Sequence, residues 1–302
     1  MWACGILCRA VQLTNVLFSL FTFPVYLFVL VLVAKHRAEF SSSFYTIFVS
    51  TGVADLWFLL HKTVFRTVPA LFFVQWAREQ KWMATVLRMG LWSIYFAEVL
   101  GVVLMSVNRF TAIVLPYSYD SIWSTKVVKC AVTAQWLLAL PWAAPMVFPS
   151  YQSYFTDDLL RVRMVEFEAE SIWYNAAITI ELGLLAPSFV IMYSSMLFCT
   201  IRRRKRKVHP RIVTGTGHSL KQQADAKRME IKLAINGFLL SLIYVMLCLV
   251  YLVPEPYASE SLSLLLVYNC LTTLFVASNP YLLIYFSCKV RTKVLAVLKL
   301  NR

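Results

Sequence analysis

Three acidic residues interrupt stretches of this sequence that are otherwise almost free of charge. Asp55 lies in VSTGVADLWF, Glu98 lies in IYFAEVLGVV, and Glu181 comes six residues before Pro187. An ionised group at the depth of a lipid bilayer costs at least about 2.5–3.5 kcal/mol, so each acid needs an interior partner, water or a bound cation. Glu98 and Glu181 are therefore candidates for ligand binding, with a plain packing role as the alternative for each.

The second constellation pairs Asp55 with the Asn-Pro sequence of VASNPYLLIYF. Asn279 and Pro280 fall inside another long apolar stretch. If the two helices pack side by side, the carboxylate of Asp55 and the amide of Asn279 would share waters or a small cation. A static polar clamp and an activation switch are equally consistent with such a pair, so Asp55, Asn279 and Pro280 are candidates for a switch.

Basic residues gather at the ends of the apolar stretches. Arg109 follows Asn108 at the end of one of them, and Glu98 precedes Arg109 by about three helical turns, on the same helix face. A further run consists of Arg202, Arg203, Arg204, Lys205, Arg206 and Lys207. Basic residues at helix ends anchor the chain to anionic lipid, and they also offer a docking surface to a cytosolic partner; the two roles are compatible.

The elements that position these residues are membrane helices. Of the 302 residues, 60% are hydrophobic and only 15% are charged, and the mean hydropathy is +0.67. A helix needs about 20 apolar residues to cross the hydrocarbon core. Seven windows of this kind predict an all-α membrane protein, a single seven-helix bundle, with spans at residues 11–34, 43–60, 89–107, 127–149, 171–201, 231–253 and 262–286.

The distribution of charge predicts the orientation of the bundle. Most of the 29 lysines and arginines fall on one side of the alternating loops, which places the N-terminus outside and the C-terminus in the cytoplasm. The net charge of +14 is then mostly cytoplasmic, and we expect it to attract anionic membrane lipids rather than nucleic acid. Residues 288–302 read as an amphipathic helix on the inner leaflet, and Cys288 at its start is a candidate for lipidation.

Enzyme and metal chemistry find no support in the sequence. It contains no CxxC or HExxH spacing and no nucleophile with a plausible histidine partner, so we expect no catalytic residues, no metal and no cofactor. The alternative to a receptor is a carrier or channel whose path uses Asp55, Glu98 and Glu181. The two halves of the chain show no internal repeat, which counts against that alternative.

Several landmarks resemble those of rhodopsin-like G-protein-coupled receptors. They are NRF at residues 108–110 followed by Pro116, Asp55 within VAD, Trp136, Pro187, and Asn279 with Pro280. The segments FPVYLFVLVLV, SSSFYTIFVSTGVADLWF, NRFTAIVLPYSYDSIW and NPYLLIYF are similar to nematode serpentine chemoreceptors of the Srg superfamily, most of all to its Srv class. The resemblance covers nearly the whole chain.

This resemblance implies a chemosensory receptor in the plasma membrane of sensory neurons, at their cilia. It would bind a small molecule in the outer half of the bundle and activate a heterotrimeric G protein, with Asn108, Arg109 and the basic run 202–207 at the cytoplasmic face. The chain departs from the common pattern because Asn108 replaces the acid before the arginine, which removes the usual local ion pair. The last predicted span contains no lysine, which rules out a retinal Schiff base.

Overall fold

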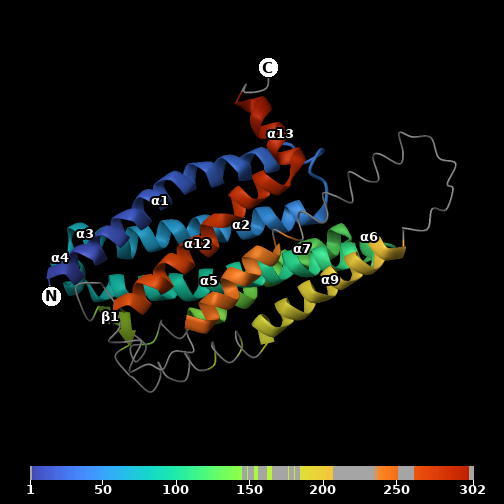
Figure 1. Ribbon diagram of the computed structural model, residues 1–302. Helices are drawn as coiled ribbons and strands as arrows, with labels where there is room; N and C mark the ends of the chain where they lie inside the picture. Colours follow the sequence, from blue (N-terminus) through green and yellow to red (C-terminus); the bar gives the residue numbers. More distant parts are fainter. Residues whose placement is uncertain are drawn as a thin grey trace.

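The fold is an elongated bundle of helices. A computed structural model describes residues 2–144, 148, 153–155, 162–164, 176, 180, 184–206, 235, 237–250 and 262–298. The long helices run roughly alongside one another, and the N-terminus lies at one end of the bundle while the C-terminal helix α13 lies at the other (Figure 1). The elements are α1 (Trp2–Lys35), α2 (Ser43–Lys62), η1 (Thr63–Thr67), α3 (Val68–Phe72), α4 (Val74–Glu79), α5 (Lys81–Val114), α6 (Tyr119–Ile122), α7 (Thr125–Ala139), η2 (Leu140–Trp142), β1 (Ser153–Phe155), β2 (Val162–Met164), α9 (Ala186–Arg206), α12 (Leu262–Phe286) and α13 (Cys288–Val297).

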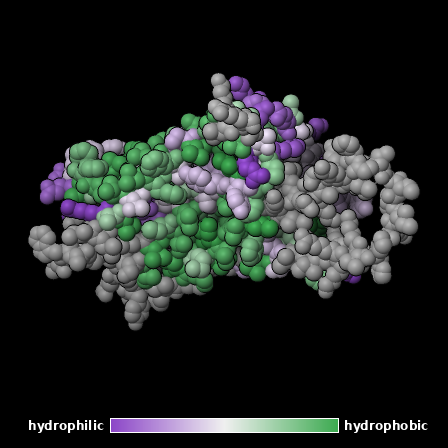
Figure 2. Space-filling model, turned by 45° about the horizontal axis from the view of Figure 1, so that its top comes forward, coloured by the Kyte–Doolittle hydropathy of each residue, from purple (hydrophilic) through white to green (hydrophobic). Residues whose placement is uncertain are grey.

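The long segments are rich in apolar side chains, as a membrane requires. They are helical because a helix satisfies its own backbone hydrogen bonds, for which the hydrocarbon core offers no other partners. Four helical stretches of the described chain are long and apolar enough to cross a membrane, at Arg9–Lys35, Ser43–Phe72, Lys81–Val114 and Val267–Phe286. A shorter apolar helix spans Gly237–Val250. Figure 2 shows a broad hydrophobic band over the middle of the described surface, with hydrophilic residues gathered toward its ends.

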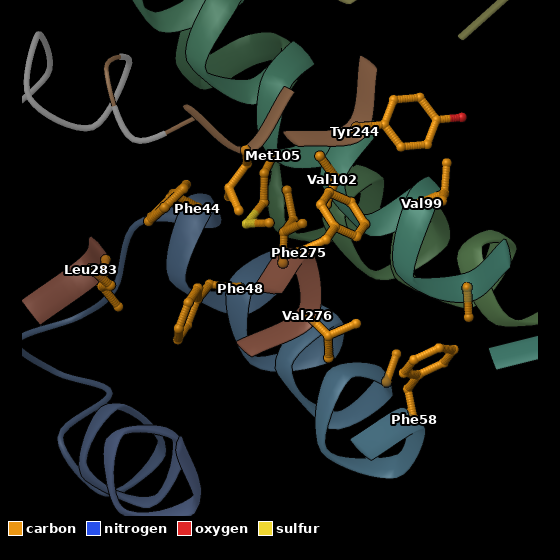
Figure 3. Close-up of a cluster of buried hydrophobic side chains, with 14 of the residues drawn as sticks. Phe44, Phe48, Phe58, Val99, Val102, Met105, Tyr244, Phe275, Val276 and Leu283 are labelled. Atoms are coloured by element: carbon orange, nitrogen blue, oxygen red, sulfur yellow. The ribbon is translucent and has the colours of Figure 1, made fainter. Parts of the chain in front are cut away.

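The core lies where α2, α5, α12 and the helix Gly237–Val250 meet. Each of these helices sends large side chains into one cluster (Figure 3). The residues labelled there are Phe44, Phe48 and Phe58 from α2, Val99, Val102 and Met105 from α5, Tyr244 from Gly237–Val250, and Phe275, Val276 and Leu283 from α12. Since α2 packs against α1, α5, α7 and α12, it is the central helix of the described bundle.

A glycine in α5 sets how closely α2 and α5 approach each other. A Cβ on Gly90 would lie 2.0 Å from Nε2 of His61, so α5 accepts the imidazole of α2 only because residue 90 has no side chain. The His61 ring lies against the carbonyl oxygens of Val86 and Leu87, at 3.1 and 3.2 Å. This contact holds the end of α2 beside the first half of α5.

Several helix bounds differ from the predicted spans. The second helix was predicted to end at residue 60. In the structure α2 ends at Lys62, and the helical path continues through the π-helical turn η1 and α3 to Phe72. The third helix begins at Lys81 rather than at residue 89 and continues to Val114 rather than to residue 107. Charged residues set the predicted edges, yet the structure buries Lys62, Arg88 and Arg109 inside the bundle.

The predicted spans 127–149, 171–201 and 231–253 are only partly covered by the described residues. The fourth helix ends at Ala139 and continues as the short η2. In the fifth span, α9 begins at Ala186, and most residues between 165 and 183 lie outside the described part of the chain. A two-stranded antiparallel hairpin pairs β1 with β2, with Tyr154 opposite Arg163, and β1 packs against α5.

Candidate functional site

A buried polar cluster joins α1, α2 and α12 at the middle of the bundle. Asp55 is completely buried. Its Oδ2 accepts a hydrogen bond from the side-chain amide of Asn279 at 2.7 Å and another from the hydroxyl of Tyr26. Pro280 follows within α12 and is also buried. Asp55 and Asn279 therefore meet directly, and Tyr26 is a third member that the sequence analysis did not anticipate.

Glu98 lies on α5 and is completely buried as well. Neither of its carboxyl oxygens has a hydrogen-bond partner in the described part of the structure, and the same holds for Oδ1 of Asp55. Glu98 lies near enough to Asp55 and Lys62 for their charges to interact. A polar or cationic partner would satisfy these two open oxygens, because an unsatisfied group in an apolar interior is costly.

Two cations that the predicted spans place in a loop lie at the end of α2 and in the turn η1 that follows it. The ammonium of Lys62 donates to three acceptors on α12: the carbonyl oxygen of Asn269 at 3.1 Å and the hydroxyls of Thr272 and Thr273, each at 3.0 Å. Arg66 Nη1 donates to the side-chain oxygen of Asn269 at 3.1 Å.

The spacing of these residues was a usable signal. Lys62 comes seven residues after Asp55, and Arg66 comes four residues after Lys62. Such intervals put side chains on one face of a helix. The sequence alone therefore indicated that Lys62 and Arg66 lie on the same helix face as Asp55.

Arg109 lies near the C-terminal end of α5 and is 6% exposed. Its guanidinium carbon is 3.6 Å from the centroid of the Phe44 ring on α2, a cation–π contact. The neighbouring turn of α5 also contacts α9, since the hydroxyls of Ser106 and Tyr193 lie 2.9 Å apart. Arg109 is therefore packed inside the bundle between helices rather than extended into the headgroup region.

Asn108 stands where the common receptor pattern has an acid, and it forms hydrogen bonds between neutral groups. It is completely buried. Its amide nitrogen donates to Oγ of Ser43 at 2.8 Å, and its amide oxygen accepts from the hydroxyl of Tyr119 at 3.2 Å. The hydroxyls of Ser43 and Tyr119 lie 2.7 Å apart. This triad ties α2, α5 and α6 together without a charge.

The helix α13 is attached to the start of α2 and to the turn that follows α1. Ser287 caps α13 and shares a 3.3 Å hydrogen bond with the hydroxyl of Tyr45 on α2. Lys293 forms an ion pair of 2.6 Å with Glu39, which follows α1. The hydrogen bond from Lys293 holds the pKa of Glu39 below its ordinary value. Cys288 is exposed at the start of α13, as a lipid attachment site would need.

Two of the predicted site features fall partly or wholly outside the described residues. Glu181 and Lys207 lie outside them. The backbone of residues 202–206 forms the end of α9, and Arg202 is exposed there. The roles assigned to these residues stay predictions.

Comparison with known proteins identifies the family. Residues 15–300 match the family described as "Serpentine type 7TM GPCR chemoreceptor Srv". This chain is an Srv-family serpentine chemoreceptor. Serpentine receptor class V-1 of Caenorhabditis elegans is 24% identical to it over 242 residues, which cover 78% of this chain and 73% of that receptor. The resemblance to the Srv class found in the sequence is thereby confirmed.

The fold of this Srv-family chain is that of rhodopsin-like receptors. The crystal structure of squid rhodopsin matches 97% of this chain and 86% of its own, with a TM-score of 0.76 and 14% sequence identity. At that identity the likeness concerns the fold alone. Together, the family and the apolar helices make the chain a multi-pass membrane protein of a receptor family, not of an enzyme family.

Proposed function

We propose that this Srv-family protein is a chemosensory receptor that binds a small molecule in the outer half of its bundle and activates a heterotrimeric G protein at its cytoplasmic face. The proposal includes seven transmembrane helices, with the N-terminus outside and the C-terminus in the cytoplasm. The four long apolar stretches supply four crossings, and α7, α9 and the helix Gly237–Val250 would supply the other three. The proposed location is the plasma membrane of sensory neurons, at the cilia.

The observation that carries the proposal is the buried arginine at the inner part of α5. Arg109 is a cation held within the bundle by an aromatic ring of α2, close to the contact between α5 and α9. A cation at this place in the bundle could contact a partner when the inner ends of the helices separate. A ligand drives that change only if it binds the two conformations with different affinities.

The binding end of the proposal rests on Glu98. Its two open oxygens lie on α5, about three helical turns outward from Arg109 and on the same face. A small molecule with a polar group would satisfy those oxygens. The same helix would then carry the ligand contact and the output residue, so a shift of α5 would connect them.

Nucleotide exchange on G proteins tests the proposal. Cells expressing wild type, Arg109→Ala or Arg37→Ala at equal surface level would be challenged with pooled small-molecule extracts. Arg37 is an exposed arginine on the inner side and serves as the matched control. We expect Arg109→Ala to lose evoked exchange and Arg37→Ala to keep it.

Two results would contradict this assignment. Unchanged evoked exchange in Arg109→Ala would remove the output role of Arg109. Substrate uptake or ionic current in proteoliposomes without any G protein would instead favour the carrier or channel alternative, whose path would use the buried acids Asp55 and Glu98.

A further inference from the structure

An apolar groove runs between α1 and α2 at the surface of the bundle and has a volume of about 320 Å³. Leu30 and Leu56 form its floor and are almost completely buried. Leu30 packs this deeply because residue 52 is a glycine, whose Cβ would lie 2.6 Å from Cδ2 of Leu30. The walls are about half-exposed, at 54% for Val31 and 46% for Val53. This α1–α2 groove therefore opens away from the bundle.

The surroundings of the α1–α2 groove are the hydrocarbon of the membrane. Both of its helices belong to stretches that are long and apolar enough to cross a membrane, Arg9–Lys35 and Ser43–Phe72. All of its lining side chains are aliphatic or aromatic, so a polar solute gains little from entering it. An unfilled groove would lack dispersion contacts on its open side. A hydrocarbon chain from the bilayer supplies those contacts.

The length of the groove matches one leaflet of the bilayer. Its lining residues on α1 run from Phe23 to Ala34, eleven positions along the helix. At a rise of about 1.5 Å per residue this is about 16 Å, and half of the hydrocarbon core is about 15 Å. Because Ala34 directly precedes Lys35, at which α1 ends, the groove lies in the half of the membrane nearer to that end. An acyl chain of this leaflet fits along it.

Two polar side chains lie at the end of the groove near Ala34. Lys35 follows Val31 by one helical turn and continues the wall that α1 provides. Thr46 precedes Val49 by three positions and continues the wall that α2 provides. Both side chains are exposed. An ammonium and a hydroxyl are donors that a phosphate group accepts, so this end of the groove suits the headgroup of a phospholipid.

No acid of the described chain neutralises Lys35. Its side chain forms no ion pair and no hydrogen bond within the described residues. Glu39, the next acid along the chain, is paired with Lys293 at 2.6 Å. With the proposed orientation, this end of the groove lies at the inner leaflet, whose lipids carry the negative surface charge of the membrane. The charge of Lys35 is thus complementary to the lipids that surround it.

We propose that the α1–α2 groove binds an anionic phospholipid, with one acyl chain along the groove and the phosphate at Lys35 and Thr46. Of the four candidate spans of the described chain, α1 buries the smallest share of its apolar stretch, 33% against 44–61% for the others. The lipid covers a face of α1 that the protein leaves open, and it joins α1 to α2. This site is separate from Glu98, which lies inside the bundle.

Native mass spectrometry of the full-length protein tests this site. The protein in mild detergent would be titrated with phosphatidylglycerol, whose only charge is its phosphate, with phosphatidylcholine, which carries its own cation, or with cholesterol. We expect the tightest site to take one phosphatidylglycerol in preference to the other two lipids. Val53→Phe fills the groove and should abolish this site. Lys35→Gln should reduce the preference for phosphatidylglycerol over phosphatidylcholine about fivefold, the usual effect of one basic residue near an anionic lipid surface.

Matched variants separate this site from the rest of the lipid-facing surface. Val267→Phe enlarges a side chain of α12 that is 46% exposed, as Val53 is, but lies outside the groove. Lys126→Gln removes an exposed lysine at the start of α7. Both should bind phosphatidylglycerol like wild type, and Lys35→Arg should keep the preference. Because the substituted side chains are exposed, we expect every variant to fold, which its melting temperature checks.

Four results would overturn the proposal. They are a tightest site that takes no phospholipid, a tightest site that takes cholesterol instead, equal phosphatidylglycerol binding in Val53→Phe and Val267→Phe, and an unchanged lipid preference in Lys35→Gln. None of these measurements involves a G protein, so the lipid site is tested independently of the proposed receptor function.

Discussion

The hydroxyl of Tyr26 offers the cleanest perturbation of the cluster around Asp55. Tyr26→Phe removes one oxygen atom and leaves the completely buried ring in place. Tyr26 and Asn279 donate to the same oxygen, Oδ2 of Asp55, while Oδ1 accepts no hydrogen bond in the described structure. If Asp55 is ionised, its charge attracts both donors to one oxygen.

The magnitude follows from that charge. A hydrogen bond to a charged group contributes about 1.5–3 kcal/mol to stability, against about 0.5–1.5 kcal/mol for a neutral pair. A loss of about 2 kcal/mol lowers the melting temperature by roughly 4–8 °C, taking the scaling for domains of about 150–250 residues. We therefore expect Tyr26→Phe to melt several degrees below wild type in nanodiscs, measured by tryptophan fluorescence.

Tyr281→Phe is the matched control because it also removes one tyrosine hydroxyl from a hydrogen bond between helices, here α1 and α12. The hydroxyls of Tyr281 on α12 and Thr22 on α1 lie 3.1 Å apart, and no charge is involved. We expect this variant to lose less stability than Tyr26→Phe. Repeating Tyr26→Phe in an Asp55→Asn background should reduce its cost by about 1 kcal/mol, since the acceptor is then neutral.

The reasoning fails if Tyr26→Phe costs no more than Tyr281→Phe and costs the same in both backgrounds. Asp55→Asn by itself then separates the two roles of the cluster. A folded variant that has lost evoked nucleotide exchange would indicate a switch, and a variant that keeps exchange but melts earlier would indicate a static clamp.

Two further predictions concern the packing of α2 and of α13. Gly90→Ala should destabilise the protein by about 1–3 kcal/mol, since its Cβ would meet Nε2 of His61 at 2.0 Å, and the loss of melting temperature should shrink in a His61→Ala background; equal losses in both would contradict the clash. Lys293 lowers the pKa of Glu39 from its ordinary value of 4.5, so the contact stabilises the docking of α13 above that pH and is lost as the pH falls below it. Amide exchange of α13 should therefore be slower in wild type than in Glu39→Gln at neutral pH, and the two should converge in acid; a difference that persists in acid would exclude the ion pair as its cause.

Parts of this arrangement could be predicted from the sequence because membrane helices leave few choices for a polar residue. Asp55 and Asn279 are each among the few polar residues of their apolar stretches, so the sequence predicted that they meet. In the structure Nδ2 of Asn279 lies 2.7 Å from Oδ2 of Asp55. Family landmarks supported the same pairing. Tyr26 was missed because a tyrosine in an apolar stretch gives no separate signal of the partner that its hydroxyl meets.

The outer cations were missed for a different physical reason. A window of uncharged residues ends at the first lysine, so the predicted second span stopped before Lys62 and the third began after Arg88. The structure continues both helices through these charges because acceptors from another helix are available, as Asn269, Thr272 and Thr273 are for Lys62. Hydropathy measures the cost of a charge in lipid and does not include a partner supplied by the fold.

Three of the polar contacts of the bundle share α2, and this has a mechanical consequence. Along α2, the Phe44 ring lies against Arg109, Asp55 accepts a hydrogen bond from Asn279, and Lys62 donates one to Thr272. The contacts of Asp55 and Lys62 both join α2 to α12, whereas that of Phe44 joins α2 to α5. A change in the contact between Lys62 and α12 therefore acts on the same interface that Asp55 and Asn279 join. Because packed interfaces change between discrete arrangements rather than deforming gradually, movement at that interface would alter how α2 supports Arg109.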